Sequence, residues 1–301
     1  MSAADLSQFT VGNLFDVSGR VGLITGGGRG IGLMITKALV ANGAKVYIAS
    51  RRLELIESIA IELTNIGPGT CKAIQADLSS KQACESLALR VADHEQHLDF
   101  LINNLGVAHL APLEQFPDEH WDQEYRLNVI SVFQLTIACL PLLEASQRQS
   151  ADPARVINIG SNGAFIHSPK IEGFSYQSSK AAINHLSSIL SSHLAGRKIN
   201  VVCVAPGIFP RFVIYYCLDT IKYLCVVALT LLTNTNNGKY INSEMSADLD
   251  VCGPEFLRGI PQDRLGNETD MSGLAIFLCS KAAAYINGST IIIDGGAILW
   301  L

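Results

Sequence analysis

The sequence predicts an α/β fold in which a doubly wound parallel sheet of about seven strands carries helices on both faces. Three observations support this prediction. The chain has 301 residues, of which 49% are hydrophobic, and this is enough to fill a large core. Short β-branched runs alternate with longer helical patterns along the chain. Most of the short runs are almost continuously apolar, which is typical of strands buried on both faces.

The expected strands and helices follow one another in regular order. The strands are the short apolar runs at residues 20–25, 45–50, 71–76, 98–103, 155–160, 199–205 and 289–294. The helical patterns lie near residues 30–43, 53–66, 80–96, 118–148, 174–197 and 268–280. We find no internal repeat and no dividing linker in the sequence, so we expect one domain over residues 1–301.

The composition excludes several classes of protein. A net charge of only −5, together with the high apolar content, excludes disorder for most of the chain. The acidic pI of about 5.8 argues against a nucleic-acid partner, which usually shows a basic face. The first eight residues do not resemble a secretory signal, and the eight cysteines form no CxxC pair. We therefore expect buried, reduced thiols in a cytoplasmic protein.

A glycine-rich turn follows the first expected strand. The turn runs from Thr25 to Gly32, with glycines at positions 26, 30 and 32 between strand and helix. Glycine lets the chain turn tightly and lets a phosphate approach the backbone at the positive end of a helix. The turn therefore predicts a nucleotide site, with a purely structural packing turn as the alternative.

The second expected strand ends in Ser50-Arg51-Arg52, about 20 residues after the glycines. An enzyme that selects NAD commonly has an acidic residue here for the ribose hydroxyls, whereas arginine suits the 2′-phosphate of NADP. Arg29 in the glycine turn would add to the positive charge. We therefore favour NADP over NAD as the cofactor; the alternative for these arginines is the solvated start of a helix.

A tyrosine and a lysine share one face of a later helix. Tyr176 and Lys180 are four residues apart, which places them on the same side of the helical pattern at 174–197. A nearby ammonium group lowers the pKa of a phenol, so this tyrosine could act as an acid or base near neutral pH. Ser161 follows the strand at 155–160 and could donate a hydrogen bond to a carbonyl oxygen, although a serine there could equally cap a turn.

Taken together and in this order, these motifs resemble the short-chain dehydrogenase/reductase family, near its 3-oxoacyl-acyl-carrier-protein reductase-like branch. The resemblance covers residues from about 18 to 297, apart from the segment 211–242. The positions that match cofactor-binding motifs are Thr25, Gly26, Arg29, Gly30, Ile31, Gly32, Asp77 and Leu78 beside the adenine, Asn104, Gly106, and Pro206 and Gly207 beside the nicotinamide. Leu105 stands where the family has alanine, which slightly crowds the cofactor wall.

The resemblance implies a Rossmann-type fold and hydride transfer between nicotinamide and a ketone or secondary alcohol. Tyr176 would be the general acid or base, and Lys180 would lower its pKa and bind the nicotinamide ribose. Ser161 would polarise the carbonyl, and Asn128 would hold a water that links Lys180 to solvent. The resemblance also implies a homodimer or homotetramer, in which the helices at 118–148 and 174–197 pack against a second subunit.

The segment 211–242 breaks the pattern, because it is first strongly apolar and then rich in asparagine. A membrane helix would have to accept Asp219 and Lys222 in its span and leave a cofactor loop, so we disfavour it. A lid over the substrate is a second interpretation. The third, which fits best, is a translated retained intron or an error in the gene prediction. If Pro210 is joined to Ser243, the family's nicotinamide loop is restored, with Ser243 contacting the cofactor amide.

Two functions from different classes remain at this point. The first is an NADP-dependent ketone or 3-oxoacyl reductase that acts on a small carbonyl or alcohol substrate. The second is a catalytically silent NADP-binding partner or sensor protein. The complete set of Asn128, Ser161, Tyr176 and Lys180 favours the enzyme, and only the segment 211–242 favours the silent protein. No third ligand accompanies His94 and His97 at a suitable spacing, so we expect no metal site.

Overall fold

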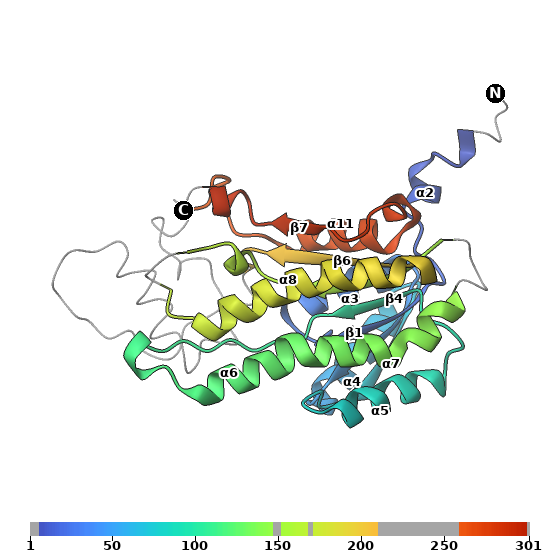
Figure 1. The fold of residues 1–301 in the computed structure, drawn as a ribbon. Coiled ribbons are helices and arrows are strands. Elements are labelled where there is room, and N and C mark those ends of the chain that lie inside the picture. The colour runs from blue at the N-terminus through green and yellow to red at the C-terminus, as the bar shows by residue number, and fades with distance from the viewer. Residues whose placement is uncertain (1–5, 147–151, 168–170, 210–258, 300–301) are drawn as a thin grey trace.

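The computed structural model describes residues 6–146, 152–167, 171–209 and 259–299. Its centre is a parallel sheet of seven strands in the order β3-β2-β1-β4-β5-β6-β7 (Figure 1). The strands are β1 (Val21–Thr25), β2 (Lys45–Ser50), β3 (Thr70–Gln75), β4 (Phe100–Asn103), β5 (Ala154–Ile159), β6 (Ile199–Pro206) and β7 (Thr290–Ile293). The strand order reverses between β1 and β4, so the predicted doubly wound α/β fold is confirmed.

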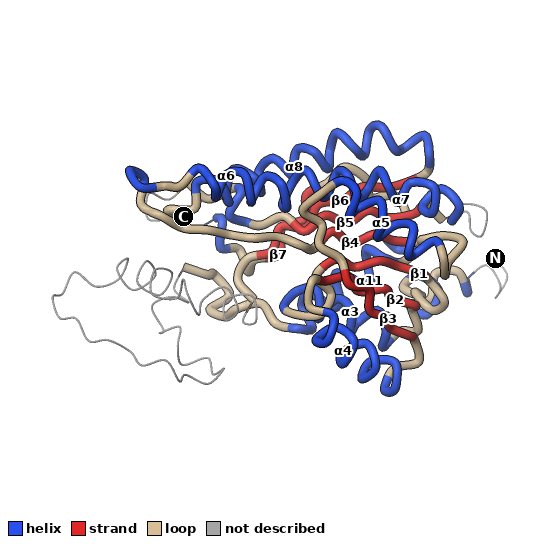
Figure 2. The backbone as a smooth tube through the Cα atoms, turned by 90° about the horizontal axis from the view of Figure 1, so that it is seen from below, coloured by secondary structure: helices blue, strands red, loops and turns tan. Residues whose placement is uncertain are grey.

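Helices cover both faces of this sheet. They are α3 (Gly30–Ala41), α4 (Leu53–Ile66), α5 (Lys81–Ala92), α6 (Asp118–Tyr125), α7 (Ser131–Ser146), α8 (Phe174–Leu194) and α11 (Glu268–Cys279), with the short α2 (Val11–Leu14) before β1. Figure 2 shows α5, α7 and α8 on one side of the strands and α3 and α4 on the other. Two layers of core are therefore expected, one on each face.

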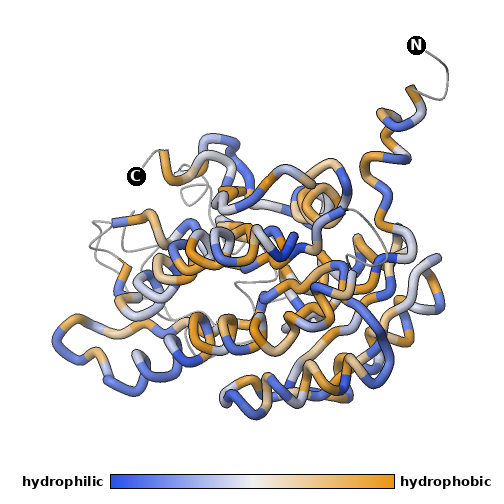
Figure 3. The backbone as a smooth tube through the Cα atoms, turned by 45° about the vertical axis from the view of Figure 1, so that its right-hand side comes forward, coloured by the Kyte–Doolittle hydropathy of each residue, from blue (hydrophilic) through white to orange (hydrophobic). Residues whose placement is uncertain are grey.

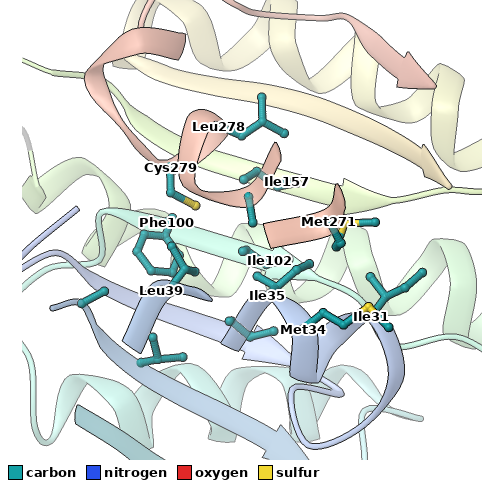
Figure 4. Packing of buried hydrophobic residues seen from close by; sticks show 14 of the residues in the cluster. Ile31, Met34, Ile35, Leu39, Phe100, Ile102, Ile157, Met271, Leu278 and Cys279 are labelled. Carbon is teal, nitrogen blue, oxygen red and sulfur yellow. The ribbon is translucent and has the colours of Figure 1, made fainter. Parts of the chain in front are cut away.

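The two cores divide the side chains of each strand between them. On β1, Leu23 packs with α5, α7 and α8, whereas Ile24 packs with α3, α4 and α11. Figure 4 shows part of the second core, where Ile35 and Leu39 of α3 meet Phe100 and Ile102 of β4. Successive strand residues point to opposite faces, and both faces of the central strands β1, β4, β5 and β6 are buried, which explains why these strands have mostly apolar sequences.

The predicted helix at 118–148 is interrupted. It consists of α6, a single π-helical turn at Arg126–Ile130, and α7. A π turn fits one more residue into the helix than an α turn would, and such turns are frequent at functional sites. The turn contains the buried Asn128. The sequence pattern predicted one unbroken helix here and did not reveal the π turn.

The run Asp118–Ser146 is long and apolar enough to cross a membrane by length and composition alone. Half of its apolar window is buried inside the fold, and α7 contributes Leu135, Cys139 and Leu143 to the core beside α5. Its hydropathy is therefore explained by packing against the sheet. The N-terminal α2 projects from the fold and exposes Val11 (Figures 1 and 3).

Some predictions fall on residues outside the described ranges. The anomalous segment 211–242 and the predicted cofactor contact Ser243 lie there. The expectation of one domain over residues 1–301, with an insertion at 211–242, stays a prediction.

Candidate active site

The glycine-rich turn has the geometry that its sequence predicts. Gly26 has a φ of +65°, a left-handed conformation that side chains disfavour. A Cβ on Gly32 would lie only 2.2 Å from the carbonyl oxygen of Gly26, so α3 begins in direct contact with the end of β1. Thr36 donates a hydrogen bond to the oxygen of Gly27 at 3.0 Å and so fastens the turn to α3. The packing interpretation and the binding interpretation of these glycines are therefore compatible.

Thr25 and Asn104 hold this turn against the end of β4. The hydroxyl of Thr25 accepts hydrogen bonds from the backbone N–H groups of Asn104 (2.9 Å) and Leu105 (3.0 Å). The Asn104 side chain donates to the oxygens of Thr25 (3.0 Å) and Gly26 (3.2 Å). Both residues were predicted to bind the cofactor, and that contact stays a prediction. In the structure their side chains fix the shape of the turn that would receive it.

A pocket opens beside this turn, at the carboxyl ends of β1, β4, β5 and β6, where ligands bind in open α/β sheets. Its walls bring together residues from five parts of the chain. They are Gly26, Arg29, Gly30, Ile31, Asn104, Leu105, Gly106, Val107, Ala108, Ile159, Gly160, Ser161, Tyr176, Lys180, Pro206 and Gly207. Most of the predicted site residues therefore lie around one cavity.

Tyr176 and Lys180 lie on adjacent turns of α8. The Lys180 Nζ atom is 5.8 Å from the centroid of the Tyr176 ring and donates to the backbone oxygen of Ile159 at 2.8 Å. Lys180 is buried, and burial lowers the pKa of its ammonium group to about 8 because it disfavours the charged form. A cation of this kind next to a phenol favours the phenolate.

Ser161 directly follows β5 and faces the same pocket. Its Oγ atom accepts a hydrogen bond from the N–H of Gly163 at 3.0 Å, so it caps the short turn Asn162–Ala164. This capping was the alternative interpretation of the residue. The bond uses the oxygen as an acceptor, and the hydroxyl proton can still be donated to another oxygen.

Asn128 links three elements beneath the pocket. Its amide nitrogen donates to the oxygen of Val107 (2.9 Å) and to the hydroxyl of Ser179 (3.0 Å), and its oxygen accepts from the N–H of Val107 (2.9 Å). A Cβ on Gly106 would lie 3.2 Å from the Asn128 oxygen and 3.5 Å from Lys180 Nζ. Asn128 therefore lies close to the pocket without lining it, and its role in holding a water stays a prediction.

The end of β6 closes the other side of the pocket. Gly207 donates from its backbone N–H to the oxygen of Ile293 on β7 at 2.9 Å. A Cβ on Gly207 would lie 2.6 Å from the Cβ of Asp294, so only glycine allows β6 to pass this close. The Asp294 carboxylate accepts from the side chain of Asn162 at 3.3 Å and connects this edge to the turn after Ser161.

The residues predicted to bind the adenosine half lie along the same edge of the sheet. Arg51 and Arg52 are exposed after β2, and Ser50 accepts a hydrogen bond from the Arg52 N–H at 3.4 Å. After β3, Asp77 is exposed, whereas Leu78 is buried in the core and can offer only its backbone to a ligand. The walls of the pocket beside Tyr176 do not include these five residues. They follow the next two strands along the sheet from the glycine turn, because β2 pairs with β1 and β3 pairs with β2.

Comparison with known proteins identifies the family. Residues 20–211 match the sequence family described as short chain dehydrogenase. The chain belongs to the short-chain dehydrogenase family. A 3-oxoacyl-[acyl-carrier-protein] reductase of rhamnolipid biosynthesis from Pseudomonas aeruginosa is 37% identical over 282 residues, which cover 94% of this chain and 97% of that protein. A 2-dehydro-3-deoxy-D-gluconate 5-dehydrogenase from Bacillus subtilis is 29% identical over 287 residues, covering 95% and 96%.

Solved structures of similar short-chain dehydrogenases share the fold over almost their full length. The Pseudomonas aeruginosa RhlG/NADP active-site complex superposes with a TM-score of 0.79 at 36% identity, covering 95% of this chain and 98% of that one. A Burkholderia cenocepacia gluconate 5-dehydrogenase in complex with NADP and tartrate gives a TM-score of 0.76 at 25% identity, with coverage of 95% and 98%. The chain is thus an NAD(P)-dependent dehydrogenase or reductase. None of these findings supports the alternative of a catalytically silent binding protein.

The structure of this short-chain dehydrogenase also shows a buried cluster that the sequence did not reveal. Glu124 is fully buried in α6 and contacts both His109 and Ser175. The α6 sequence, Asp118–Tyr125, carries its aromatic residues Trp121 and Tyr125 on one side, so the pattern does not mark Glu124 as an inward-facing residue. Among the described residues, no group of three or more His, Cys, Asp or Glu side chains could hold a metal ion.

Proposed function

We propose that this protein is an NADP-dependent reductase of ketones, with 3-oxoacyl compounds as the leading substrate class. The observation that carries the proposal is the buried Lys180 ammonium group beside the Tyr176 ring, at the mouth of a pocket that also contains Ser161 and the glycine turn. A cation beside a phenol favours the phenolate, so this arrangement suits Tyr176 to proton transfer with a substrate oxygen in the pocket.

The residues around the pocket fit a dinucleotide. Gly26 and Gly30 line it without side chains, the N-terminus of α3 faces it, and a Cβ on Gly106 would crowd Asn128 and Lys180. The exposed Arg51 and Arg52 lie on the neighbouring strand end, where they suit a 2′-phosphate. Two structurally similar enzymes are described as NADP complexes, which supports the same cofactor here.

When bound, NADPH supplies the hydride that reduces the carbonyl carbon. Ser161 donates a hydrogen bond to the carbonyl oxygen and holds it near Tyr176. Tyr176 gives its phenolic proton to the same oxygen as negative charge develops there. The positive charge of Lys180 would favour loss of the phenolic proton, and its ammonium group would hold the nicotinamide ribose. Asn128 would keep a water in contact with Lys180, through which a proton could return from solvent.

Two features support a substrate with an apolar body. Leu105, Val107 and Ala108 form apolar walls of the pocket, and the 37% identical relative is named as a 3-oxoacyl reductase. Relatives named as 2-dehydro-3-deoxy-D-gluconate 5-dehydrogenases represent the competing polar substrates. The test compares NADPH oxidation with a 3-oxoacyl thioester and with a keto-gluconate. Faster reduction of the keto-gluconate would refute the 3-oxoacyl assignment.

Tyr176→Phe is the matched control for this assay, because it removes only the phenolic hydroxyl. We expect turnover to fall by about 10²–10⁴-fold while NADPH binding, measured by fluorescence, stays within twofold. If the wild-type protein binds NADPH but Tyr176→Phe reduces the substrate equally fast, Tyr176 is not the acid. If the wild-type protein does not bind NADPH at all, the proposed function itself fails.

The exposed surface of two helices supports a homodimer or homotetramer. Ile130, Phe133 and Ile137 are exposed along the π turn and α7, and Ile189 is exposed on α8, the two helices expected at the interface. Sedimentation of the purified protein would test the assembly, because exposed apolar residues in a row favour association.

The described cysteines support a cytoplasmic location. They are Cys71, Cys84, Cys139, Cys203 and Cys279, and all five are buried and free.

A further inference from the structure

Glu124 is the acceptor at the centre of a buried hydrogen-bond cluster. The backbone N–H of His109 donates to its Oε1 atom at 2.5 Å, and the His109 Nδ1 atom lies 3.0 Å from the same oxygen. The hydroxyl of Ser175 donates to Oε2 at 2.5 Å. An ionised carboxylate only accepts hydrogen bonds, so the two donors that converge on it, the His109 N–H and the Ser175 hydroxyl, fit the ionised form of Glu124.

This carboxylate connects two walls of the pocket. Ser175 immediately precedes Tyr176 in the first turn of α8. His109 immediately follows Val107 and Ala108, which line the pocket after β4. The same two segments also meet through a hydrogen bond from the N–H of Ala111 to the oxygen of Glu172 at 3.1 Å. The position of Tyr176 relative to the opposite wall therefore depends on Glu124.

The charges around Glu124 come from three elements. His109 lies on the loop after β4, and its ring stacks on His120 of α6 with centroids 4.3 Å apart. Glu119 acts on His120 from the same helix, and Lys180 acts on Glu124 from α8. Burial raises the pKa of Glu124, while its bonds from Ser175 and His109 oppose that shift. The negative charge of Glu124 in turn raises the pKa of Lys180 against the larger effect of burial.

We propose that Glu124 is a positioning residue for the reaction: its carboxylate ties the loop after β4 to the first turn of α8, and its negative charge acts on the Lys180–Tyr176 pair. The proposal rests on the proposed function, because Tyr176 must be the acid for its surroundings to matter in turnover. The cluster does not touch the pocket surface directly, since neither Glu124 nor Ser175 lines it. Glu124 therefore acts through Tyr176 and Lys180.

The deciding variant is Glu124→Gln, which keeps the size of the side chain but removes its charge. Loss of an anion makes both Lys180 and Tyr176 lose their protons at lower pH. Reduction needs the protonated phenol. The pH above which the rate of reduction falls should therefore be lower in this variant by about half a pH unit or more. Asp118→Asn is the matched control, because it also removes one carboxylate charge from α6, at an exposed position outside this cluster, and should leave the profile in place.

A second readout does not depend on turnover. The ionisation of Tyr176 can be followed by ultraviolet absorbance, as the difference between a protein with Tyr176 and the same protein with Tyr176→Phe. We expect this difference to titrate at lower pH in the Glu124→Gln background. An unchanged titration would overturn the proposal even before a substrate is found, and an unchanged rate profile would overturn it once a substrate is in hand. Absence of NADPH binding by the wild-type protein would instead count against the proposed function.

Ser175→Ala keeps the proposal falsifiable if Glu124→Gln does not fold. This variant removes one donor and keeps the negative charge, so kcat should fall about tenfold with KM for NADPH unchanged and no shift of the pH profile. Hydrogen exchange at the N–H of His109 should remain slow, because its bond to Glu124 is intact. Wild-type kcat in Ser175→Ala would show that this cluster does not position Tyr176.

Discussion

Replacing Gly32 by alanine is the sharpest test of the glycine turn. An added Cβ would lie 2.2 Å from the Gly26 oxygen and 2.5 Å from the Asn104 amide nitrogen, whereas real Cβ contacts stay above 3.0 Å. The turn must therefore retreat by about 0.8 Å. Overpacking against backbone destabilises the fold by about 3 kcal/mol at the upper end. Replacing glycine by alanine inside a helix stabilises it by about 1 kcal/mol through helix propensity. The free energy of unfolding should fall by about 2 kcal/mol.

Gly273→Ala in α11 is the matched control, because a Cβ there would meet nothing within 4 Å. It should raise the free energy of unfolding by up to about 1 kcal/mol through helix propensity alone. Urea denaturation and NADPH titration would be measured for both variants. We expect Gly32→Ala to bind NADPH at least about tenfold more weakly, because a shift of about 1 Å displaces the backbone that faces the phosphates. Wild-type stability and affinity in Gly32→Ala would refute this account of the turn.

Three further predictions concern the cofactor, the pH dependence and the segment 211–242. The Lys180 ammonium group has a pKa of about 8 and loses its proton as the pH rises through that value. We therefore expect kcat/KM for reduction to fall above about pH 8. A value that stays level to about pH 10 would contradict this prediction. The double variant Arg51→Ala and Arg52→Ala should weaken NADPH binding by about 1–3 kcal/mol and leave NADH binding unchanged. Equal losses of affinity for both cofactors would exclude a role for these arginines in recognising the 2′-phosphate. Sequencing the transcript across the codons for Ala205 to Ala247 should yield a message without residues 211–242, whereas a message that always contains them would remove the retained-intron hypothesis.

The sequence predicted the sheet because each strand carries its own signal. Strands buried on both faces must be apolar throughout, so runs such as Val21–Thr25 and Ile199–Pro206 are recognisable without any knowledge of their neighbours. The order of the strands is a property of tertiary contacts, and no prediction of it was made from the sequence. The π turn at Arg126–Ile130 escaped notice because its residues are as helical in composition as those around them.

The candidate site was predicted where chemistry depends on residue type and spacing. Tyr176 and Lys180 are on one helix face, and Ser161 follows a strand, so local sequence places all three at the pocket. Thr25 and Asn104 were harder to interpret, because their bonds to each other connect β1 to β4 across a long stretch of sequence. Glu124 could not be predicted, since its burial depends on the approach of His109 and Ser175 from two other elements.

The π turn also limits which length changes this family member can tolerate. One residue fewer between Arg126 and Ile130 would restore a continuous α-helix from Asp118 to Ser146 and rotate α7 by about 100° relative to α6. Leu135, Cys139 and Leu143 would then leave the core, or Asn128 would turn away from Val107. Single-residue deletions in this stretch should therefore destabilise the fold far more than substitutions do. The length of the π turn is set both by the packing of α7 in the core and by the hydrogen bonds of Asn128.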